Sequence, residues 1–564
     1  DPNDFEIGRR HGLAELTVIG FDGRMNDSAG AYAGMDVIAA QAAVAEELER
    51  RGQLVSSTPH EHEVGHCDRT GDRIEPLISL QWFMRMDELA RPANEAVRSG
   101  RVRFHPKSQE NTYFNWMDDL RPWCISRQLW WGHQIPVWYC PDGHVTVAAE
   151  QPAACSECGD GRLEQDADVL DTWFSSALWP FATLGWPEPT ARLDRYYPGD
   201  VLSTARDIIN LWVARMLMMG CEFMGEPPFV DVLIHATIQA PDGRRMSKSL
   251  GTGTDPLELI EEHGADATRY GLLKMSSTQD VRFDRGAIEE GGRLANKLWN
   301  AGRFVLTSGR TGIEPAPRGE QPADRWIRSR LAAVQIDVVR LFDSFDFSAA
   351  VKTLYGFAWN DYCDWYIEAC KARLQGDDGD AADDATANLR WVLERILALA
   401  HPVMPFVTEQ LWEHLAPERG LLMLSPLPEP RPDHHDPAAE RAMSDAIAAV
   451  SAVRAADRSV RLVLPRGFAG EQLVRALVPA TAVELADVPA IVVEPVADDP
   501  AAVHAALETE LERAEAELAR ARGMLGNERF TSRAPAAVVD EERSKAERYG
   551  AEVDELRSRL AQLG

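Results

Sequence analysis

The pattern of apolar and polar positions divides the chain into regions with different expected secondary structure. Between about residues 75 and 280, short strand-like apolar runs such as 135–139 and 229–234 alternate with helical spacing, as in 205–220. This alternation predicts an α/β layer with a parallel sheet. From about residue 290 to 430 the helical period dominates, and we expect a helix bundle there.

Smaller regions flank this body. The first 70 residues mix short apolar runs with glycine turns, and they predict a strand at 16–21 and a helix at 35–51. Prolines gather at 424–437, which we interpret as a linker. A small α/β segment with strands at 461–464 and 490–494 is expected to follow it.

The last 60 residues carry a heptad pattern in two segments. Apolar residues recur at alternating steps of four and three in each segment, and they are Leu507, Leu511, Ala514, Leu518, Ala521 and Leu525, then Tyr549, Val553, Leu556, Leu560 and Leu563. The remaining faces are almost wholly charged, so the pattern predicts an antiparallel coiled-coil hairpin. The alternative is a pair of helices packed on the body of the protein.

Composition and charge restrict the class of protein. Hydrophobic residues make up 45% and charged residues 26% of the chain, which is ordinary for a globular protein and excludes a disordered or fibrous one. The net charge of −30 argues against indiscriminate nucleic-acid binding, but not against a local basic face for one structured RNA. No apolar run reaches the ~18 residues of a membrane span. The eight cysteines are too sparse for a disulfide framework, so we expect a cytoplasmic protein.

The sharpest chemical signal is the segment 245–249, Arg-Met-Ser-Lys-Ser, which lies between the turn 241–243 and two glycines at 251 and 253. Its basic side chains supply charge, its hydroxyl and backbone N–H groups supply donors, and glycine allows close approach to a polyphosphate. Such a loop can stabilise the charge that develops on a pyrophosphate leaving group. The alternative is a solvated basic loop.

Several motifs resemble the class I aminoacyl-tRNA synthetases. Segment 245–249 is similar to the second signature of that family, Lys-Met-Ser-Lys-Ser, with Arg245 in place of the first lysine. Trp-Cys-Ile-Ser-Arg-Gln at 123–128, Trp-Trp-Gly-His at 130–133 and Asp-Val-Leu-Asp-Thr-Trp-Phe-Ser-Ser at 168–176 resemble the catalytic domain of the valine, isoleucine and leucine enzymes.

Both ends of the chain resemble the valine branch of this family. At the start, Asp-Pro-Asn-Asp-Phe-Glu-Ile-Gly at 1–8 is similar to its editing domain. Near the end, Asn-Glu-Arg-Phe at 527–530 and the segment 534–539 are similar to its terminal hairpin. The isoleucine branch usually ends in a cysteine-rich zinc module, whereas no cysteine follows Cys370 here.

The resemblance implies a multidomain protein with α/β and all-α parts. Its expected parts are the end of an editing domain at 1–72, the second half of a Rossmann-type class I catalytic domain at 73–285, an α-helical anticodon-binding bundle at 286–430, a linker with a small α/β segment at 431–502, and a coiled-coil tRNA-binding arm at 503–564. The first signature of the family, of the His-Ile-Gly-His type, does not occur in the sequence. We therefore expect a carboxy-terminal portion that by itself lacks half of the ATP site.

The resemblance also implies a valine pocket. Trp173, Ile208 and Trp212 correspond to residues that surround the side chain of the amino acid, and Asp207 corresponds to the carboxylate that holds its ammonium group. The chemistry agrees, because an α-ammonium group favours a carboxylate and a bulky wall excludes side chains larger than valine. From their spacing alone, the three apolar residues would be ordinary core.

For ATP, which should arrive with Mg²⁺, the resemblance implies a second set of residues. Lys248, Met246 and His235 are expected to bind the nucleotide. Lys248 is also expected to act on the phosphates during catalysis, together with Arg245, Ser247 and Ser249.

A pocket for valine cannot strongly reject threonine, which merely adds a hydroxyl group; this limit is a known property of this very family. The family therefore hydrolyses mischarged threonine at a second site. Asp1 and Asp4 correspond to acidic residues of that editing pocket, where a carboxylate can bind the ammonium of a threonyl group. The alternative is that these residues cap a helix.

Four residues have the spacing of metal ligands. Cys140, His144, Cys155 and Cys158 follow the pattern Cys-x3-His-x10-Cys-x2-Cys, within a knuckle expected at 138–165. Thiolates and an imidazole at such spacing can close a tetrahedral structural Zn²⁺ site. The alternative is a knuckle that has lost its metal.

In the helical region, aromatic segments at 345–347, 359–366 and 404–409 resemble the anticodon-binding bundle of the family. Most of these rings should be core, and a few exposed ones could stack on anticodon bases. The nearest basic residues either hold the RNA backbone or form a solvated face, and they are Lys352, Lys371 and Arg373.

Together these features imply a monomeric enzyme that attaches valine to tRNA(Val) through valyl-adenylate and edits mischarged threonine. An isoleucine-specific synthetase is an alternative. A non-catalytic fragment that only binds tRNA is another.

Overall fold

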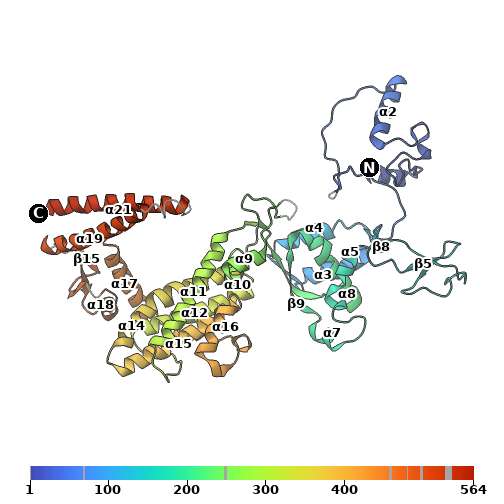
Figure 1. The fold of residues 1–564 in the computed structure, drawn as a ribbon. Coiled ribbons are helices and arrows are strands. Elements are labelled where there is room, and N and C mark those ends of the chain that lie inside the picture. The colour runs from blue at the N-terminus through green and yellow to red at the C-terminus, as the bar shows by residue number, and fades with distance from the viewer. Residues whose placement is uncertain are drawn as a thin grey trace. The chain divides into compact units, whose positions relative to one another are not determined.

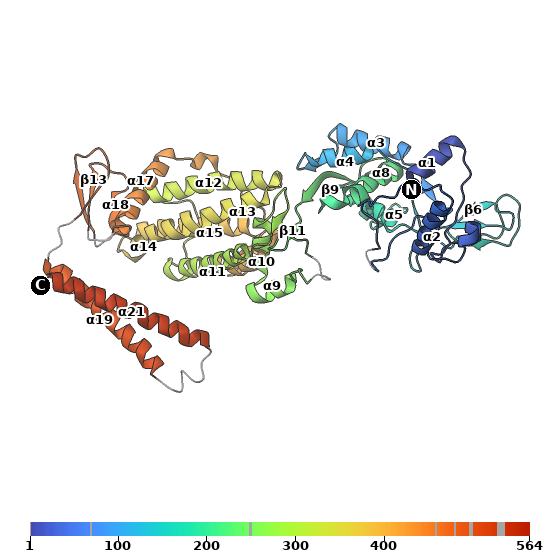
Figure 2. The same cartoon turned by 90° about the horizontal axis from the view of Figure 1, so that it is seen from above.

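The structure of the chain is a computed structural model. It describes residues 2–67, 70–246, 251–456, 460–478, 481–495, 500–526 and 536–563. The chain divides into two compact units, Asp1–Ile234 and His235–Gly564, whose elements can be followed in Figure 1 and from above in Figure 2. Across the described ranges, no helix is both long and apolar enough to cross a membrane.

The start of the first unit is helical, with little buried core. Its elements are α1 (Pro2–His11), η1 (Asp27–Tyr32) and α2 (Val37–Arg50). The helix expected at 35–51 is confirmed as α2. The strand expected at 16–21 is wrong, because this segment forms only one bridge, from Ile19 to Met25. A strand needs a partner along its length for its N–H and C=O groups, and the described residues supply none here.

A three-stranded sheet forms the body of the first unit. Its strands lie in the order β2 (Arg103–His105), β10 (Phe229–His235) and β9 (Gly199–Ala205). Strand β10 runs parallel to β2, with Val232 opposite Phe104. This pairing confirms the parallel arrangement that the alternating pattern predicted.

Helices pack around this sheet and share one apolar core with it. They are α3 (Asp87–Arg98), α4 (Gln109–Met117), α5 (Thr172–Ala177), α6 (Trp179–Ala182), α7 (Ala191–Tyr196) and α8 (Ala214–Met224). Helix α8 is the central one, because its first seven residues are all buried. The helical segment expected at 205–220 begins irregularly, with a tight 3₁₀ turn, η2 (Arg206–Ile208), and a wide π turn, η3 (Ile209–Val213).

Short strands form three small sheets beside this body. One pairs β1 (Phe83–Met84) with β3 (Trp123–Cys124), another pairs β4 (Ser126–Arg127) with β8 (Val169–Leu170), and the third has the order β6 (Val145–Val147), β5 (Val137–Tyr139), β7 (Glu164–Gln165).

The second unit is mainly helical. It begins with the parallel pair β11 (Ile238–Gln239) and β12 (Val281–Arg282) and the helices α9 (Pro256–His263) and α10 (Ala265–Lys274). The expected bundle follows as α11 (Arg285–Ser308), α12 (Pro322–Asp343), α13 (Phe347–Tyr355), η4 (Gly356–Tyr366), α14 (Ile367–Gln375), α15 (Gly379–Ala400) and α16 (Pro405–Leu415). Helix α15 is almost wholly buried, so it forms the centre of the bundle core.

After the bundle, the turns η5 (Pro417–Arg419), η6 (Leu422–Leu424) and η7 (Pro432–His434) lead to α17 (Pro437–Arg454) and α18 (Glu471–Leu477). Strands β14 (Ala482–Ala486), β13 (Val460–Pro465) and β15 (Val492–Pro495) form a small sheet in that order. Sequence analysis expected two of these strands and missed β14. Helices α19 (Pro500–Leu525) and α21 (Ala536–Leu563) lie side by side in both views (Figures 1 and 2).

Candidate functional site

The first candidate site lies where β8 leads into α5. Asp171 caps the helix, and its Oδ1 accepts a hydrogen bond from the backbone N–H of Trp173 at 3.3 Å. A cap of this kind satisfies an N–H group that the first turn of a helix leaves unpaired. Trp173 is the second residue of this helix, so the cap fixes the backbone from which its indole extends.

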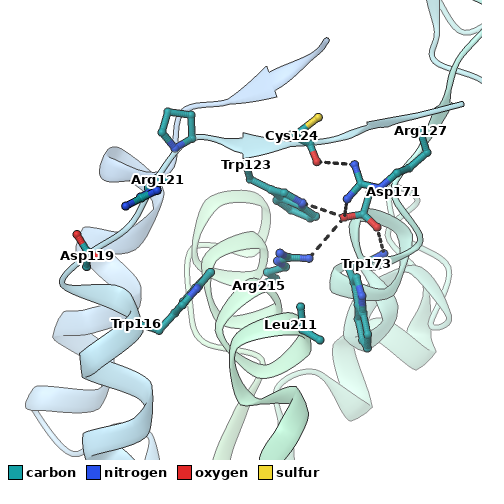
Figure 3. A pocket seen from close by; sticks show the side chains of 11 residues that line it. Trp116, Asp119, Arg121, Trp123, Cys124, Arg127, Asp171, Trp173, Leu211 and Arg215 are labelled. Carbon is teal, nitrogen blue, oxygen red and sulfur yellow. Dashed lines mark hydrogen bonds and ion pairs between the residues drawn. The ribbon is translucent and has the colours of Figure 1, made fainter. Parts of the chain in front are cut away.

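Trp173 lines an open cavity of about 660 Å³ (Figure 3). Aromatic and basic side chains dominate its wall, and they are Trp116, Trp123, Trp173, Arg121, Arg127 and Arg215. Asp119 and Asp171 supply the negative charge. The cavity therefore combines ring surfaces with an excess of guanidinium groups.

A charged group, which we call the Asp171 cluster, forms one side of this cavity (Figure 3). It contains the buried residues Asp171, Arg215 and Trp123 and the partly exposed Arg127. The Oδ2 atom of Asp171 accepts hydrogen bonds from Trp123 Nε1 and Arg127 Nη2, each at 2.9 Å, and lies 3.7 Å from Arg215 Nη1. The guanidinium of Arg215 also lies 3.8 Å from the centre of the Trp123 ring, in cation–π contact.

Arg215 remains charged in this environment. Burial lowers the pKa of its guanidinium to about 10, while the Asp171 carboxylate opposes the shift. A pKa of that size keeps the group protonated at neutral pH. One carboxylate therefore faces two cations at the edge of the cavity.

Among the other residues expected to bind valine, Trp212 lies in the π turn η3 and contacts α5 directly. Its Nε1 donates a hydrogen bond to the carbonyl of Ser176 at 2.9 Å. The preceding turn η2 carries Ile208, which is half-buried, and Asp207, whose side chain is 60% exposed and lies 4.0 Å from Arg206. The structure thus joins Trp173 and Trp212 through α5, and it leaves the Asp207 carboxylate accessible.

The residues expected to bind ATP belong to the second unit. His235 is exposed at the end of β10, with Nδ1 3.1 Å from the carbonyl of Ala236. Arg245 pairs with Gln239 of β11 in an isolated bridge, and Thr252 donates to its carbonyl at 3.1 Å. Met246 is half-buried. Ser247, Lys248 and Ser249 lie outside the described residues.

The four expected metal ligands converge at the sheet of β5, β6 and β7. Their ligand atoms all lie within 4.8 Å of one another. Cys140 Sγ is 3.4 Å from His144 Nδ1 and 3.7 Å from Cys158 Sγ. Backbone N–H groups of Cys158 and Glu157 donate to the Cys155 thiolate and lower its pKa to about 6. The pKa of the neighbouring Cys158 is instead raised to about 11, so of these two thiols only Cys155 favours the thiolate without a metal. Three thiols and an imidazole this close together have the donor chemistry of a four-coordinate metal site.

Of the two acidic residues expected for editing, the structure describes only Asp4. Asp4 is exposed in the first turn of α1. It lies inside the helix, so it does not have the capping position that was its alternative. Asp1 lies outside the described residues.

The three basic residues expected on the bundle have different environments. Arg373 is paired with Asp324 through two hydrogen bonds of 2.7 Å, and Asp324 is completely buried. Its guanidinium is engaged by the core, so Arg373 fits neither of the two alternatives, an RNA contact or a solvated face. Lys371 pairs with Glu368 at 2.6 Å, and Lys352 is exposed.

Of the aromatic residues that were expected to be core, Tyr362 and Tyr366 are fully buried, and Trp365 packs against the bundle core while partly exposed. Trp359 is half-buried and stacks on Tyr355 with ring centres 5.4 Å apart. Phe406 is 64% exposed.

The heptad positions of the last two helices face each other. They form one apolar cluster of Leu507, Ala514, Leu518, Val553 and Leu556, with Leu511, Tyr549 and Leu560 at its margin. Ion pairs from Arg513 to Glu552 at 3.3 Å and from Arg557 to Glu515 at 2.6 Å connect the helices. Ala521 is also buried, whereas the side chain of Leu563 and the segment 527–535 lie outside what the structure describes.

The Asp171 cluster was not predicted from the sequence, although the position of Arg215 indicated that a buried partner must exist. Arg215 interrupts the apolar run at 211–220, and a charge on a buried helix is costly unless a partner compensates it. The sequence therefore indicates that Arg215 has a partner, but it does not indicate which residue that is. The partners are Asp171, which caps α5, and the ring of Trp123 in β3, and only the fold brings them together.

Comparison with known proteins agrees with this architecture. Three family models match the chain: class I tRNA synthetases (I, L, M and V) at residues 13–284, the anticodon-binding domain of tRNA ligase at 324–462, and the valyl-tRNA synthetase tRNA-binding arm at 499–564. Among solved structures, methionyl-tRNA synthetase of Mycobacterium tuberculosis bound to methionyl-adenylate has a TM-score of 0.51 at 20% identity, covering 65% of this chain and 71% of that one. This likeness shows a class I synthetase fold.

Curated relatives match along the whole chain. Valine–tRNA ligase of Carboxydothermus hydrogenoformans is 42% identical over 600 residues, covering 100% of this chain and 68% of that protein. The valine–tRNA ligases of Geobacillus stearothermophilus and Bacillus subtilis are 42% and 41% identical, each again over 100% of this chain and 68% of the relative. Identity at this level over this length identifies the family: the chain belongs to the valine–tRNA ligases, within the class I aminoacyl-tRNA synthetases.

Proposed function

We propose that this chain takes part in the ATP-dependent attachment of valine to tRNA(Val) through valyl-adenylate. The observation that carries the proposal is the identity of about 40% with valine–tRNA ligases along the entire chain. The hydrogen bond from Trp212 to α5, the helix that carries Trp173, supports it, because it holds two residues of the proposed valine pocket on connected segments.

Within this reaction, Trp173, Ile208 and Trp212 surround the valine side chain, and Asp207 binds its ammonium group. The exposed carboxylate of Asp207 suits this role, since a charge-assisted hydrogen bond needs an acceptor that the fold has not already saturated. In the second unit, His235 and Met246 contact the nucleotide.

Lys248, with Arg245, Ser247 and Ser249, stabilises the charge on the leaving pyrophosphate, and Mg²⁺ enters with ATP. Adenylate formation also needs a His-Ile-Gly-His-type signature, which the 564 residues do not contain. We propose that the chain by itself is therefore inactive.

We propose that Cys140, His144, Cys155 and Cys158 hold a structural Zn²⁺. Thiolates bound to one tetrahedral zinc at about 2.3 Å lie roughly 3.8 Å apart, and the observed distance from Cys140 Sγ to Cys158 Sγ is 3.7 Å. Zinc would close the knuckle at 138–165 and has no open position for catalysis.

The remaining proposals concern tRNA. Residues 1–72 belong to an editing domain, in which Asp1 and Asp4 bind the ammonium of a misplaced threonyl group. Residues 286–430 bind the anticodon, and the hairpin of α19 and α21 forms a coiled-coil arm at 503–564. The interlocking heptad cluster of that hairpin supports a unit that can contact RNA without belonging to the catalytic domain. Residues 73–285 supply the second half of the catalytic domain, and 431–502 connect the bundle to the arm.

The proposal is tested by pyrophosphate exchange with this chain and with the product of the complete open reading frame that encodes it. Lys248→Ala in the active protein should lower kcat by about 10²–10³-fold and change the KM for valine little, because the charge acts on the leaving group. Arg244→Ala is the control, since this neighbouring base is already paired with Asp242 at 2.7 Å.

An unchanged kcat with a raised KM for valine would contradict the role of Lys248. A preference for isoleucine would favour an isoleucine-specific enzyme. Binding of tRNA(Val) by a complete product with no exchange activity would favour a non-catalytic tRNA-binding protein.

A further inference from the structure

The carboxylate of Asp171 binds the backbone of Trp173 with one oxygen and two other side chains with the other. Oδ1 of Asp171 accepts the N–H of Trp173 at 3.3 Å, while Oδ2 accepts Trp123 Nε1 and Arg127 Nη2 at 2.9 Å (Figure 3). The same side chain therefore caps α5 and attaches it to β3 and β4.

Arg215 extends this attachment to the helix that follows Trp212. It lies 3.7 Å from Asp171 Oδ2 and three residues after Trp212, which is about one helical turn. Helix α5 and the η3–α8 segment are thus connected twice, through Asp171 to Arg215 and through the Ser176 carbonyl to Trp212 Nε1. Trp173 lies on α5 and Trp212 on the η3–α8 segment.

Stability alone does not account for such a cluster. Asp171 and Arg215 are 5% and 7% exposed, so both charges lose most of their hydration. Arg215 Nε has no hydrogen-bond partner among the described residues. Buried ion clusters with unsatisfied groups are often no more stable than apolar residues of equal volume, and what they can provide is a defined geometry.

We infer that Asp171 is a positioning residue that sets the width of the valine pocket, by fixing Trp173 on α5 against the η3–α8 segment that carries Trp212. The inference rests on the proposed function of Trp173 and Trp212 as pocket walls. Asp171 itself does not touch the amino acid. It acts by preventing α5 from moving away from α8, a movement that would admit a side chain one methylene longer than valine.

The test compares valine with isoleucine in pyrophosphate exchange by the complete gene product. In Asp171→Asn the amide oxygen can still cap Trp173, but an NH₂ group then faces the donors of Trp123 and Arg127. The kcat/KM ratio of valine over isoleucine should fall by about tenfold, within the range that one methylene is worth in a pocket; synthetases of this family are among the cases that define that range. A general loss of folding would lower both activities and leave the ratio unchanged.

Two further variants make the outcome decisive. Asp324→Ala, which removes a buried carboxylate of the bundle, should lower the melting temperature and keep the ratio. Trp173→Ala removes the wall itself and should lower the ratio at least as far as Asp171→Asn. If Trp173→Ala leaves the ratio unchanged, the proposed pocket is wrong. If Trp173→Ala lowers it and Asp171→Asn does not, the positioning role alone is overturned.

Arg215→Lys covers the case in which Asp171→Asn does not fold. It keeps the positive charge and shortens the reach toward Asp171. The valine-over-isoleucine ratio should again fall, and an unchanged ratio in a folded Arg215→Lys protein would overturn the inference.

Discussion

Two carboxylates in different units, Asp171 and Asp324, are both buried beside arginine, but they are saturated in different ways. Both oxygens of Asp324 accept hydrogen bonds from the single guanidinium of Arg373 at 2.7 Å, and Tyr366 adds a third bond at 2.7 Å. Asp171 instead divides its oxygens between a helix cap, donors from β3 and β4, and an ion pair with Arg215, and it borders an open cavity of about 660 Å³.

The difference separates a pair that closes a core from a cluster that supports a site. The Asp324 pair is matched in charge and lies within the bundle, so its removal should affect folding. The Asp171 cluster carries excess positive charge and holds a residue of the cavity wall, so its removal should affect selectivity as well. We therefore expect a substitution of Asp324 to lower the free energy of unfolding without changing the preference for valine, and a substitution of Asp171 to change that preference.

The largest effect is expected at the cysteine cluster, where we propose that a Zn²⁺ ion supplies the counter-charge. Cys155→Ser should release about one zinc ion per chain and loosen residues 138–165, because the zinc affinity of small domains, about 10–16 kcal/mol, is folding free energy. Elemental analysis and limited proteolysis measure both effects. Cys67→Ser, outside the cluster, is the control and should keep both properties. A parent protein without metal would contradict the zinc proposal.

The next largest effect concerns the matched pair. Asp324→Ala should lower the free energy of unfolding by about 3–5 kcal/mol, because it leaves the Arg373 guanidinium buried without its partner. Urea denaturation measures this. The control Asp378→Ala removes only the cap of α15 and should cost about 1 kcal/mol. If Asp324→Ala also changed the preference for valine over isoleucine, the distinction between the two clusters would be lost.

Removal of the hairpin should leave both clusters intact and weaken only the binding of RNA. The complete gene product, truncated after the residue that is 495 here, should bind tRNA(Val) at least about tenfold more weakly, and its salt slope should fall by about 0.9 for each phosphate that the hairpin no longer binds. Its rate of valyl-adenylate formation should persist. Filter binding at several salt concentrations, beside pyrophosphate exchange, makes the comparison. An equal loss in both assays would mean that the hairpin supports the fold.

The smallest effect concerns a third carboxylate, Asp231 of β10, which is only partly buried. A hydrogen bond from Arg103, supported by one from His105, lowers its pKa in the folded state. The stabilisation is therefore present above the pKa of the unfolded state and is lost as the pH falls through the folded-state pKa.

Asp231→Asn should cost about 1 kcal/mol or less near neutral pH, since Arg103 is largely exposed. Parent and variant should converge in acid, which melting curves over a pH series would reveal. A difference that grew as the pH fell would contradict this assignment.

Local signals in the sequence were enough to predict several elements. The helix α2, the parallel strand β10, the helix bundle and the facing heptads of α19 and α21 each depend on a periodic pattern that neighbouring residues complete. The spacing of Cys140, His144, Cys155 and Cys158 likewise predicted their convergence, because turns at Gly143 and Gly159, with φ of 81° and 76°, bring the ligands back toward one another.

Other features depended on distant partners. The apolar run at 16–21 has the composition of a strand, but a strand exists only where a second one pairs with it. Arg373 has a positive charge that could bind RNA, yet it forms hydrogen bonds with Asp324, which lies on another helix.

The sequence by itself thus determined the family, the periodic elements and the types of chemistry present. The tertiary structure decided which charged groups remain exposed to a ligand and which are paired inside the protein. A charged side chain carries no local mark of its partner. Asp171 and Arg215 lie far apart in the chain, and the cost of burying them is offset only when the fold places Asp171 within hydrogen-bonding distance of Arg127 and ion-pairing distance of Arg215.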